Sequence, residues 1–158
     1  PDMMAQAQSM ASNMSPSDWS SARNAMSSMT PEQIQQQAGT AQQQFNAQAQ
    51  YLISGSQQVK NEGNRLHSSG KYQEAIEKYE RAKSTISAQN TSEAMELRKA
   101  CTLNLSSCYL NLKQWEKCIQ QCNEALAGEA DSLKALYRRG QAYLGSSQWA
   151  EAVEDLSR

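Results

Sequence analysis

The feature that most constrains this 158-residue chain is an internal repeat in its second half. Small residues recur at equivalent places, in pairs 12 positions apart: Gly63 and Ala75, Ser106 and Cys118, Gly140 and Ala152. The second and third units are 34 residues apart, and the first and second are 43 apart, which is one period plus nine residues. A fixed period of this length indicates stacked helical hairpins, because helix backbones approach closely only where side chains are short.

The 34-residue period resembles that of the tetratricopeptide repeat, a pair of antiparallel helices. The resemblance begins near residue 55 and implies an all-α, right-handed solenoid. We expect repeat one at about residues 56–98, repeat two at 99–132 and a truncated repeat three at 133–158. The nine extra residues lie within repeat one, and we expect them to lengthen its second helix and the first helix of repeat two.

Residues 1–54 form a separate segment, which is rich in Gln, Ser, Ala and Met. Helix starts are predicted at Ser15 and Thr30, because each is followed by a proline and then, three residues after the cap, by an acid or amide that can cap back. A third helix is expected near Thr40, and Gly55 is a candidate break in it.

The role of this segment is left open between two readings. A methionine-rich helical face could hold unfolded clients, because methionine adapts to varied partners. The alternative is a set of loosely packed helices or a partly disordered linker beside the first repeat. Residues 1–14 have neither a cap nor a periodic apolar face, so we expect their amide hydrogens to exchange rapidly.

Composition and charge argue against several classes of function. The net charge is −1 and no basic run stands out, which argues against a nucleic-acid partner. No stretch approaches the ~20 apolar residues of a membrane span. The sequence has no Ser/His/Asp or Cys/His constellation and no phosphate-binding loop, so we expect no enzymatic activity, no cofactor and no small-molecule substrate.

All four cysteines lie in the second repeat, at Cys101, Cys108, Cys118 and Cys122. We interpret them as small, reduced core residues of a cytosol-facing protein. A metal site is disfavoured, because no C-x2-C pair occurs and the single histidine, His67, is distant in sequence.

Five polar residues recur at matching places in the first helices of the repeats: Lys60, Asn64, Asn104, Lys134 and Arg138. Lys60 and Asn64 are four residues apart and therefore share a helix face, as do Lys134 and Arg138. Asn104 stands one 34-residue period before Arg138. Cations and carboxamides grouped in this way predict a receptor for an extended, carboxylate-rich peptide.

This pattern, Lys-x3-Asn, then Asn, then Lys-x3-Arg, resembles the dicarboxylate-clamp tetratricopeptide domains of chaperone partners. The resemblance implies that the ligand is the C-terminal Glu-Glu-Val-Asp tail of heat shock protein 70 or heat shock protein 90. Candidate contacts with residues upstream in that tail are Ser107, Asn111 and Gln141. Arg139 occupies a normally apolar packing position, and we expect it to extend its charge to the surface.

The two Pro-containing helix starts and the stretch at residues 135–143 resemble the plant outer-envelope tetratricopeptide receptor family. That family docks heat shock protein 70 with preprotein cargo at chloroplast outer-envelope or endoplasmic-reticulum membranes. Because the chain begins at Pro1 and stops at Arg158, within the third repeat, we expect a fragment whose membrane anchor lies beyond Arg158. The alternative is a structural scaffold that binds another partner or associates with itself.

Overall fold

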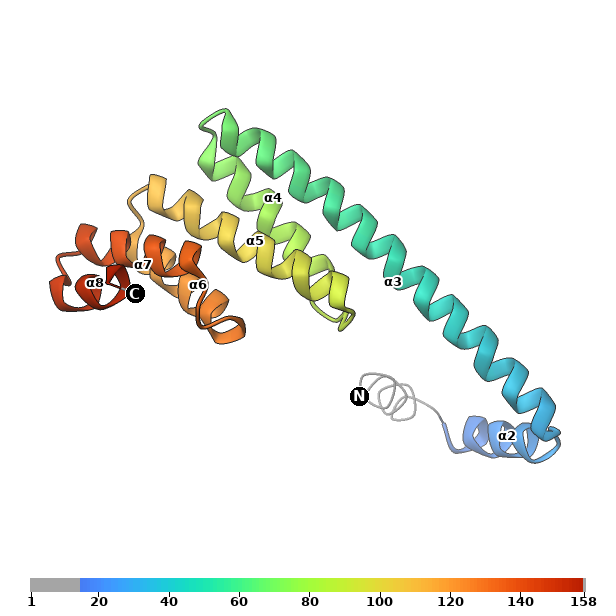
Figure 1. Cartoon of the computed structure of the whole chain (residues 1–158). Coiled ribbons are helices and arrows are strands. Elements are labelled where there is room, and N and C mark those ends of the chain that lie inside the picture. Colours follow the sequence, from blue (N-terminus) through green and yellow to red (C-terminus); the bar gives the residue numbers. More distant parts are fainter. Residues whose placement is uncertain (1–14, 158) are drawn as a thin grey trace. The chain divides into compact units, whose positions relative to one another are not determined.

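A computed structural model describes residues 15–157 of the chain, and all regular secondary structure in this range is helical (Figure 1). The chain divides into two compact units, one ending at Ala49 and the other beginning at Gln50. With the labels of Figure 1, the helices are α2 (Pro16–Ser27), α3 (Pro31–Ser68), α4 (Tyr72–Thr85), α5 (Ser92–Asn111), α6 (Trp115–Gly128), α7 (Leu133–Gly145) and α8 (Trp149–Leu156).

Helices α2 and α3 begin where the sequence predicts, each with a proline as its first residue. The Ser15 amide donates to Asp18 Oδ2 at 3.1 Å, and the Asp18 amide donates back to Ser15 Oγ at 3.3 Å. The same reciprocal pair occurs at α3, where the Thr30 amide donates to Gln33 Oε1 at 2.9 Å and the Gln33 amide donates to Thr30 Oγ1 at 3.3 Å. These capping boxes satisfy backbone donors that a helix start otherwise leaves unpaired.

Helix α3 differs from the expectation of a new helix near Thr40 and a break at Gly55. It continues without interruption from Pro31 to Ser68. Its sequence is rich in Gln and Ala, which favour helix, and a glycine in a helix costs only about 1 kcal/mol. Gly55 is therefore a weak point that the surrounding helix tolerates. The expectation for residues 1–14 lies outside the described residues.

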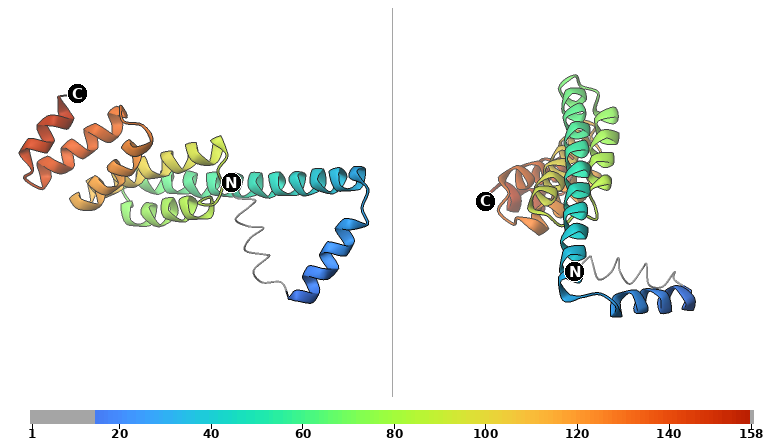
Figure 2. Two further views of the ribbon diagram at one scale, coloured as in Figure 1. Left: turned by 90° about the horizontal axis from the view of Figure 1, so that it is seen from below. Right: turned by 90° about the vertical axis from the view of Figure 1, so that its right-hand side faces the viewer.

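The unit from Gln50 onward consists of helical hairpins. Helix α4 lies along the C-terminal part of α3, and Figure 2 shows the α5–α6 and α7–α8 hairpins (yellow to red) following one another. Helix α5 packs against α4, α6 and α7. The predicted small residues lie at the close contacts within hairpins: a Cβ added to Gly63 would stand 2.8 Å from the Tyr79 ring, and one added to Gly140 would stand 2.7 Å from Leu156.

The turn inside each hairpin repeats as faithfully as the helices. Gly70, Lys113 and Ser147 occupy equivalent positions, and all three have positive φ, at 75°, 57° and 64°. Their amides donate to the carbonyl three residues earlier, at 3.0 Å for Gly70 and Lys113 and 3.2 Å for Ser147. A left-handed residue at this point lets the chain reverse and satisfies the last carbonyls of the helix.

The nine-residue insertion lengthens helix α5 and the connection that precedes it. Helix α5 has 20 residues against 13 in α7, and the connection before it, residues 86–91, is two residues longer than the connection at 129–132. Helices α4 and α6 have 14 residues each. The expectation of a longer α5 is therefore confirmed, whereas the expectation of a longer α4 is wrong.

The core of this unit is made of small and medium side chains. The four cysteines are free thiols and fully buried between helices, which confirms their interpretation as core residues. Burial raises the pKa of both Cys101 and Cys108 to about 11, so these thiols stay protonated at neutral pH. Such a core holds α5 at a fixed distance from its neighbours, and α5 carries the middle of the candidate site.

Candidate functional site on helices α3, α5 and α7

The two predicted carboxamides meet directly across helices α3 and α5. The Asn104 Nδ2 donates to Asn64 Oδ1 at 3.0 Å. The same oxygen accepts from the hydroxyl of Tyr79, on α4, at 2.8 Å. The residues are 40 positions apart in sequence, so only the stacking of the repeats brings their side chains together.

Lys60 lies one turn before Asn64 on α3 and is half-buried. Its charge acts across to α5, where it opposes the burial-driven rise in the pKa of Cys101. Within residues 15–157 its ammonium forms neither a hydrogen bond nor an ion pair with the chain. Lys60 therefore adds a positive charge beside the paired carboxamides that no carboxylate of the described chain neutralises.

Helix α7 contributes the other two cations. Lys134 is exposed in the first turn of α7, and Arg138 follows one turn later and is half-buried. The Arg138 Nη1 donates to the carbonyl of Leu103 at 2.6 Å and lies 3.4 Å from Ser106 Oγ. Because Leu103 and Ser106 flank Asn104, Arg138 reaches the same part of α5 that meets α3.

Five basic residues elsewhere in the described chain are paired with carboxylates, whereas the three cations of this surface are not. Several other basic residues of the described chain pair with carboxylates: Lys71 with Glu74, Lys78 with Glu62, Lys83 with Glu124, Lys99 with Glu129, and Arg139 with Asp155. Lys60, Lys134 and Arg138 have no such partner within residues 15–157. Three unneutralised cations beside two amides produce a local positive potential that attracts anions.

The three candidate upstream contacts also lie on α5 and α7, and each is engaged in a hydrogen bond within the domain. Ser107 Oγ lies 3.0 Å from Nε2 of His67, and Ser107 O accepts from Asn111 Nδ2 at 2.8 Å. The Gln141 Nε2 donates to the hydroxyl of exposed Tyr137 at 2.9 Å. A ligand that bound these side chains would have to replace only the one hydrogen bond that each of them forms within the domain.

His67 is a residue of this surface that the sequence reasoning missed. It packs edge-on against Tyr72, with ring centroids 5.2 Å apart. Burial, and to a smaller extent the charge of Arg138, lower the pKa of His67, so its neutral form is favoured. Its position three residues after Asn64 places it on the same helix face, and this spacing is the signal that could have identified it.

Arg139 does not extend to the surface as expected. Its Nε and Nη2 donate to the two carboxylate oxygens of Asp155, both at 2.6 Å, and its Nη1 donates to Asn123 at 2.6 Å. The side chain of Asp155 is only 3% exposed. Helix α8 therefore supplies a buried carboxylate that neutralises Arg139. Through its bonds to Asn123 and Asp155, Arg139 links helices α6, α7 and α8.

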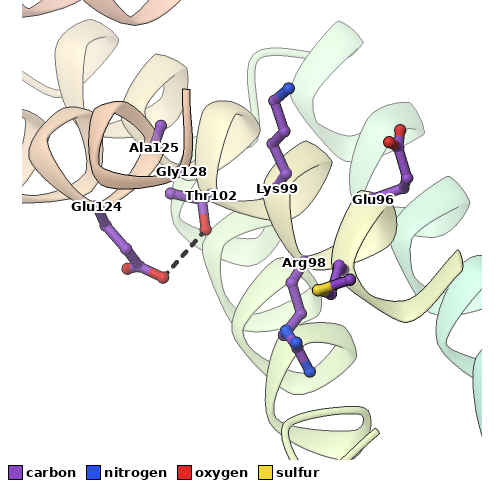
Figure 3. A pocket seen from close by; sticks show the side chains of 8 residues that line it. Glu96, Arg98, Lys99, Thr102, Glu124, Ala125 and Gly128 are labelled. Atoms are coloured by element: carbon purple, nitrogen blue, oxygen red, sulfur yellow. Dashed lines mark hydrogen bonds between the residues drawn. The ribbon is translucent and has the colours of Figure 1, made fainter. Parts of the chain in front are cut away.

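A separate pocket of about 370 Å³ lies between the first half of α5 and the end of α6 (Figure 3). Most of its charged side chains are already engaged: Glu124 with Lys83 at 2.6 Å, Lys99 with Glu129, and Arg98 with the carbonyls at residues 86, 87 and 89. Figure 3 also shows the contact between Thr102 and Glu124, at 3.5 Å. These contacts hold the inserted turns of α5 and the preceding connection in place, which is a structural role.

Comparison with known proteins agrees with the fold. No protein-family model matches the chain. Outer envelope protein 61 of Arabidopsis thaliana is 45% identical over 113 residues, which cover 72% of this chain and 20% of that protein. The human peptidyl-prolyl isomerase FKBP4 is 29% identical over 124 residues, which cover 75% of this chain and 27% of FKBP4. The chain thus spans about a fifth to a quarter of the length of these relatives.

Two solved structures show the same arrangement of helices. The second tetratricopeptide domain of RPAP3, bound to the HSP90 peptide SRMEEVD, has a TM-score of 0.59 and 26% identity and covers 73% of this chain and 92% of that chain. The first RPAP3 domain, with the same peptide, has a TM-score of 0.54 and 28% identity over 65% of this chain and 74% of that chain. Within residues 15–157, none of the helices combines the length and the hydropathy that a bilayer span requires. The chain is a tetratricopeptide-repeat protein that resembles Outer envelope protein 61 of Arabidopsis.

Proposed function

We propose that this chain is a non-enzymatic docking module that binds the acidic C-terminal tail, Glu-Glu-Val-Asp, of heat shock protein 70 or heat shock protein 90. One observation carries the proposal: the carboxamides of α3 and α5 meet, and the three cations of the same set of helices, Lys60, Lys134 and Arg138, lack a carboxylate partner in residues 15–157. The two RPAP3 domains, which bind a peptide ending in EEVD, support the choice of ligand.

The roles follow from the resemblance to clamp domains and from the chemistry of the side chains. Lys60, Asn64 and Asn104 hold the terminal carboxylate, Lys134 meets the side chain of the last aspartate, and Arg138 reaches the backbone or acids just upstream. Hydrogen bonds to charged groups contribute ~1.5–3 kcal/mol each. Ordering a flexible tail offsets much of this gain, so we expect micromolar affinity, about −8 kcal/mol.

The test is a calorimetric titration of the Glu-Glu-Val-Asp peptide into the wild type and Lys134→Ala. Lys134 is exposed and unpaired within the described chain, so its removal should not disturb the fold. We expect a loss of about tenfold in affinity, which corresponds to ~1.4 kcal/mol. Lys117→Ala on α6 removes an equal charge away from the site and should leave the affinity unchanged. Equal affinity of Lys134→Ala and wild type would contradict the proposal.

The alternative function is a structural scaffold whose partner is another protein or a second copy. A scaffold surface does not require a free carboxylate, so it would bind an amidated peptide as well as the free acid, or bind neither. Sedimentation of the chain over a range of concentrations tests self-association independently. Concentration-dependent dimerisation with no response to the tail peptide would favour the scaffold.

We further propose that residues upstream in the tail decide between the two chaperones and that the heat shock protein 70 tail is preferred. The five clamp residues contact only the shared terminus, whereas Ser107, Asn111 and Gln141 lie where a longer peptide would continue. The resemblance to the plant outer-envelope receptor family, which docks heat shock protein 70, is the basis of this preference. Competition between the two tail peptides at fixed ionic strength tests it. Equal affinity, or preference for the heat shock protein 90 tail, would contradict the selectivity and leave the clamp intact.

The same similarity supports a place for the module at an organelle surface. We propose that it faces the cytosol at the chloroplast outer envelope or the endoplasmic reticulum, and that it receives preproteins delivered by the chaperone. An anchor would have to lie outside residues 15–157, because no helix in that range is suited to span a bilayer. Soluble chain added to an import assay should compete with the organelle for chaperone-bound preprotein, and the Lys134→Ala variant should need about tenfold more protein for the same effect.

A further inference from the structure

We propose that Tyr79 is a positioning residue for the anion site, because its hydroxyl fixes the Asn64 amide so that this amide offers a ligand only N–H donors. The inference rests on the proposed function and adds to it a residue from α4, outside the three helices that carry the five clamp residues. It explains how a neutral carboxamide is committed to binding anions.

The geometry makes Asn64 Oδ1 the centre of a three-residue network. It accepts from the Tyr79 hydroxyl at 2.8 Å and from Asn104 Nδ2 at 3.0 Å. A carbonyl oxygen has two lone pairs, and both are used here. What remains of the Asn64 amide is its NH₂ group, which has two donors and no acceptor.

The alternative orientation of the amide is unfavourable in this setting. Rotating Asn64 alone by 180° about its last side-chain bond would bring Nδ2 against Asn104 Nδ2, so that two donors face each other. It would also leave the proton of the Tyr79 hydroxyl without an acceptor at a residue that is only 1% exposed. An unsatisfied buried donor costs about 1–3 kcal/mol, which is enough to favour the observed orientation strongly.

Tyr79 is itself held firmly. Its ring packs beneath Gly63, where an added Cβ would come within 2.8 Å of Cε1. Burial raises the pKa of Tyr79 to about 12, although the amide of Asn104 acts in the opposite direction. The hydroxyl therefore keeps its proton at neutral pH and remains available as a donor to Asn64.

The test compares Tyr79→Phe with Tyr109→Phe by titrating each with the Glu-Glu-Val-Asp peptide as free acid and as C-terminal amide. Both changes remove one hydroxyl from a buried ring, but the Tyr109 hydroxyl donates to Glu80, at 2.9 Å, and not to a clamp residue. We expect Tyr79→Phe to weaken the free acid by about five- to tenfold and the amide much less, because a single hydrogen bond is lost from the network. Tyr109→Phe should leave both affinities within about twofold of wild type.

A double variant separates positioning from a general loss of structure. With Asn64→Ala in place, Tyr79→Phe should cause no further loss, because its target is gone. Equal weakening of both peptides by Tyr79→Phe, or the same loss on the Asn64→Ala background, would overturn the inference. If Asn64→Ala weakens binding and Tyr79→Phe does not, only the role of Tyr79 falls. If Asn64→Ala has no effect, the proposed function falls with it.

Asn64→Asp provides a second test that does not depend on the tyrosine variant. A carboxylate at residue 64 can still accept from Tyr79 and Asn104, so the thermal midpoint should be at least that of wild type. It would present a negative oxygen, in place of NH₂, to the peptide carboxylate, and binding should fall by about 100-fold or more. Retention of wild-type affinity in a folded Asn64→Asp protein would overturn the inference.

Discussion

The most informative stability experiment compares two glycines of helix α3 that have opposite surroundings. A Cβ added to Gly55 meets no atom within 4 Å, whereas one added to Gly63 meets the Tyr79 ring at 2.8 Å. Alanine is favoured over glycine in a helix by about 1 kcal/mol. Gly55→Ala should therefore stabilise the domain by roughly 0.5–1 kcal/mol.

Gly63→Ala gains the same helix propensity but must displace a ring that is 1% exposed and hydrogen-bonded to Asn64. Overpacking of a filled core costs about 1–3 kcal/mol. The net effect should range from neutral to about 2 kcal/mol of destabilisation. The unfolding free energies of the two variants should thus differ by about 1–3 kcal/mol. Each kcal/mol of this difference corresponds to a Tm difference of roughly 4–8 °C.

The assay is denaturant unfolding followed by circular dichroism at 222 nm, with Tm as a second measure. Tail-peptide affinity provides a further readout, because a displaced Tyr79 no longer holds Asn64, and Gly63→Ala should weaken binding whereas Gly55→Ala should not. Equal stabilisation by both substitutions would refute the reasoning, since it would mean that the contact between Gly63 and Tyr79 is not close.

Three further predictions concern stability. Asp155→Ala should lower the unfolding free energy by about 3 kcal/mol, because it leaves the guanidinium of Arg139 without its buried partner; urea unfolding measures this. The pKa of His67 is lowered in the fold, so protonation favours the unfolded chain and stability should fall as the pH drops below about 6.5. Urea midpoints at several pH values test this. Lys113→Gly should raise Tm, because the positive φ at this position costs about 1 kcal/mol for lysine and almost nothing for glycine.

Each of these predictions has a matched control. Glu151→Ala removes an exposed carboxylate from the same helix, α8, and should change stability by less than about 0.5 kcal/mol. His67→Gln should flatten the pH dependence between about 7.5 and 5.5, since the chain has a single histidine; an unchanged slope would contradict the assignment. Gln120→Gly lies inside helix α6 on its exposed face and should destabilise by about 1 kcal/mol, the opposite sign to Lys113→Gly.

Much of the fold can be predicted because equivalent residues occur in each repeat and make equivalent contacts. The period equates Gly63 with Gly140, and the structure places each against a residue 16 positions later. The hairpin turns repeat with the same spacing, at Gly70, Lys113 and Ser147. What local patterns could not decide was the length of α3. A glycine lowers helix stability without forcing an end, and neighbouring glutamine and alanine residues outweighed it.

The site was predictable as a set of residue types but not as a network. Helical spacing relates Lys60 to Asn64 on one helix, yet the contact of Asn64 with Tyr79 crosses between helices and depends on the close approach at Gly63. The prediction that Arg139 extends its charge to the surface was wrong for the same reason, because its partner Asp155 lies on the following helix, α8. Contacts between elements depend on packing geometry, which the periodicity of one element does not contain.

The most direct test of the central claim is calorimetric titration of wild-type chain with the Glu-Glu-Val-Asp peptide, as free acid and as C-terminal amide, at one fixed ionic strength. If Lys60, Asn64 and Asn104 hold the terminal carboxylate, the free acid should bind with micromolar affinity and the amide at least about tenfold more weakly. Equal affinity of the two peptides, or no measurable binding of the free acid, would contradict the account.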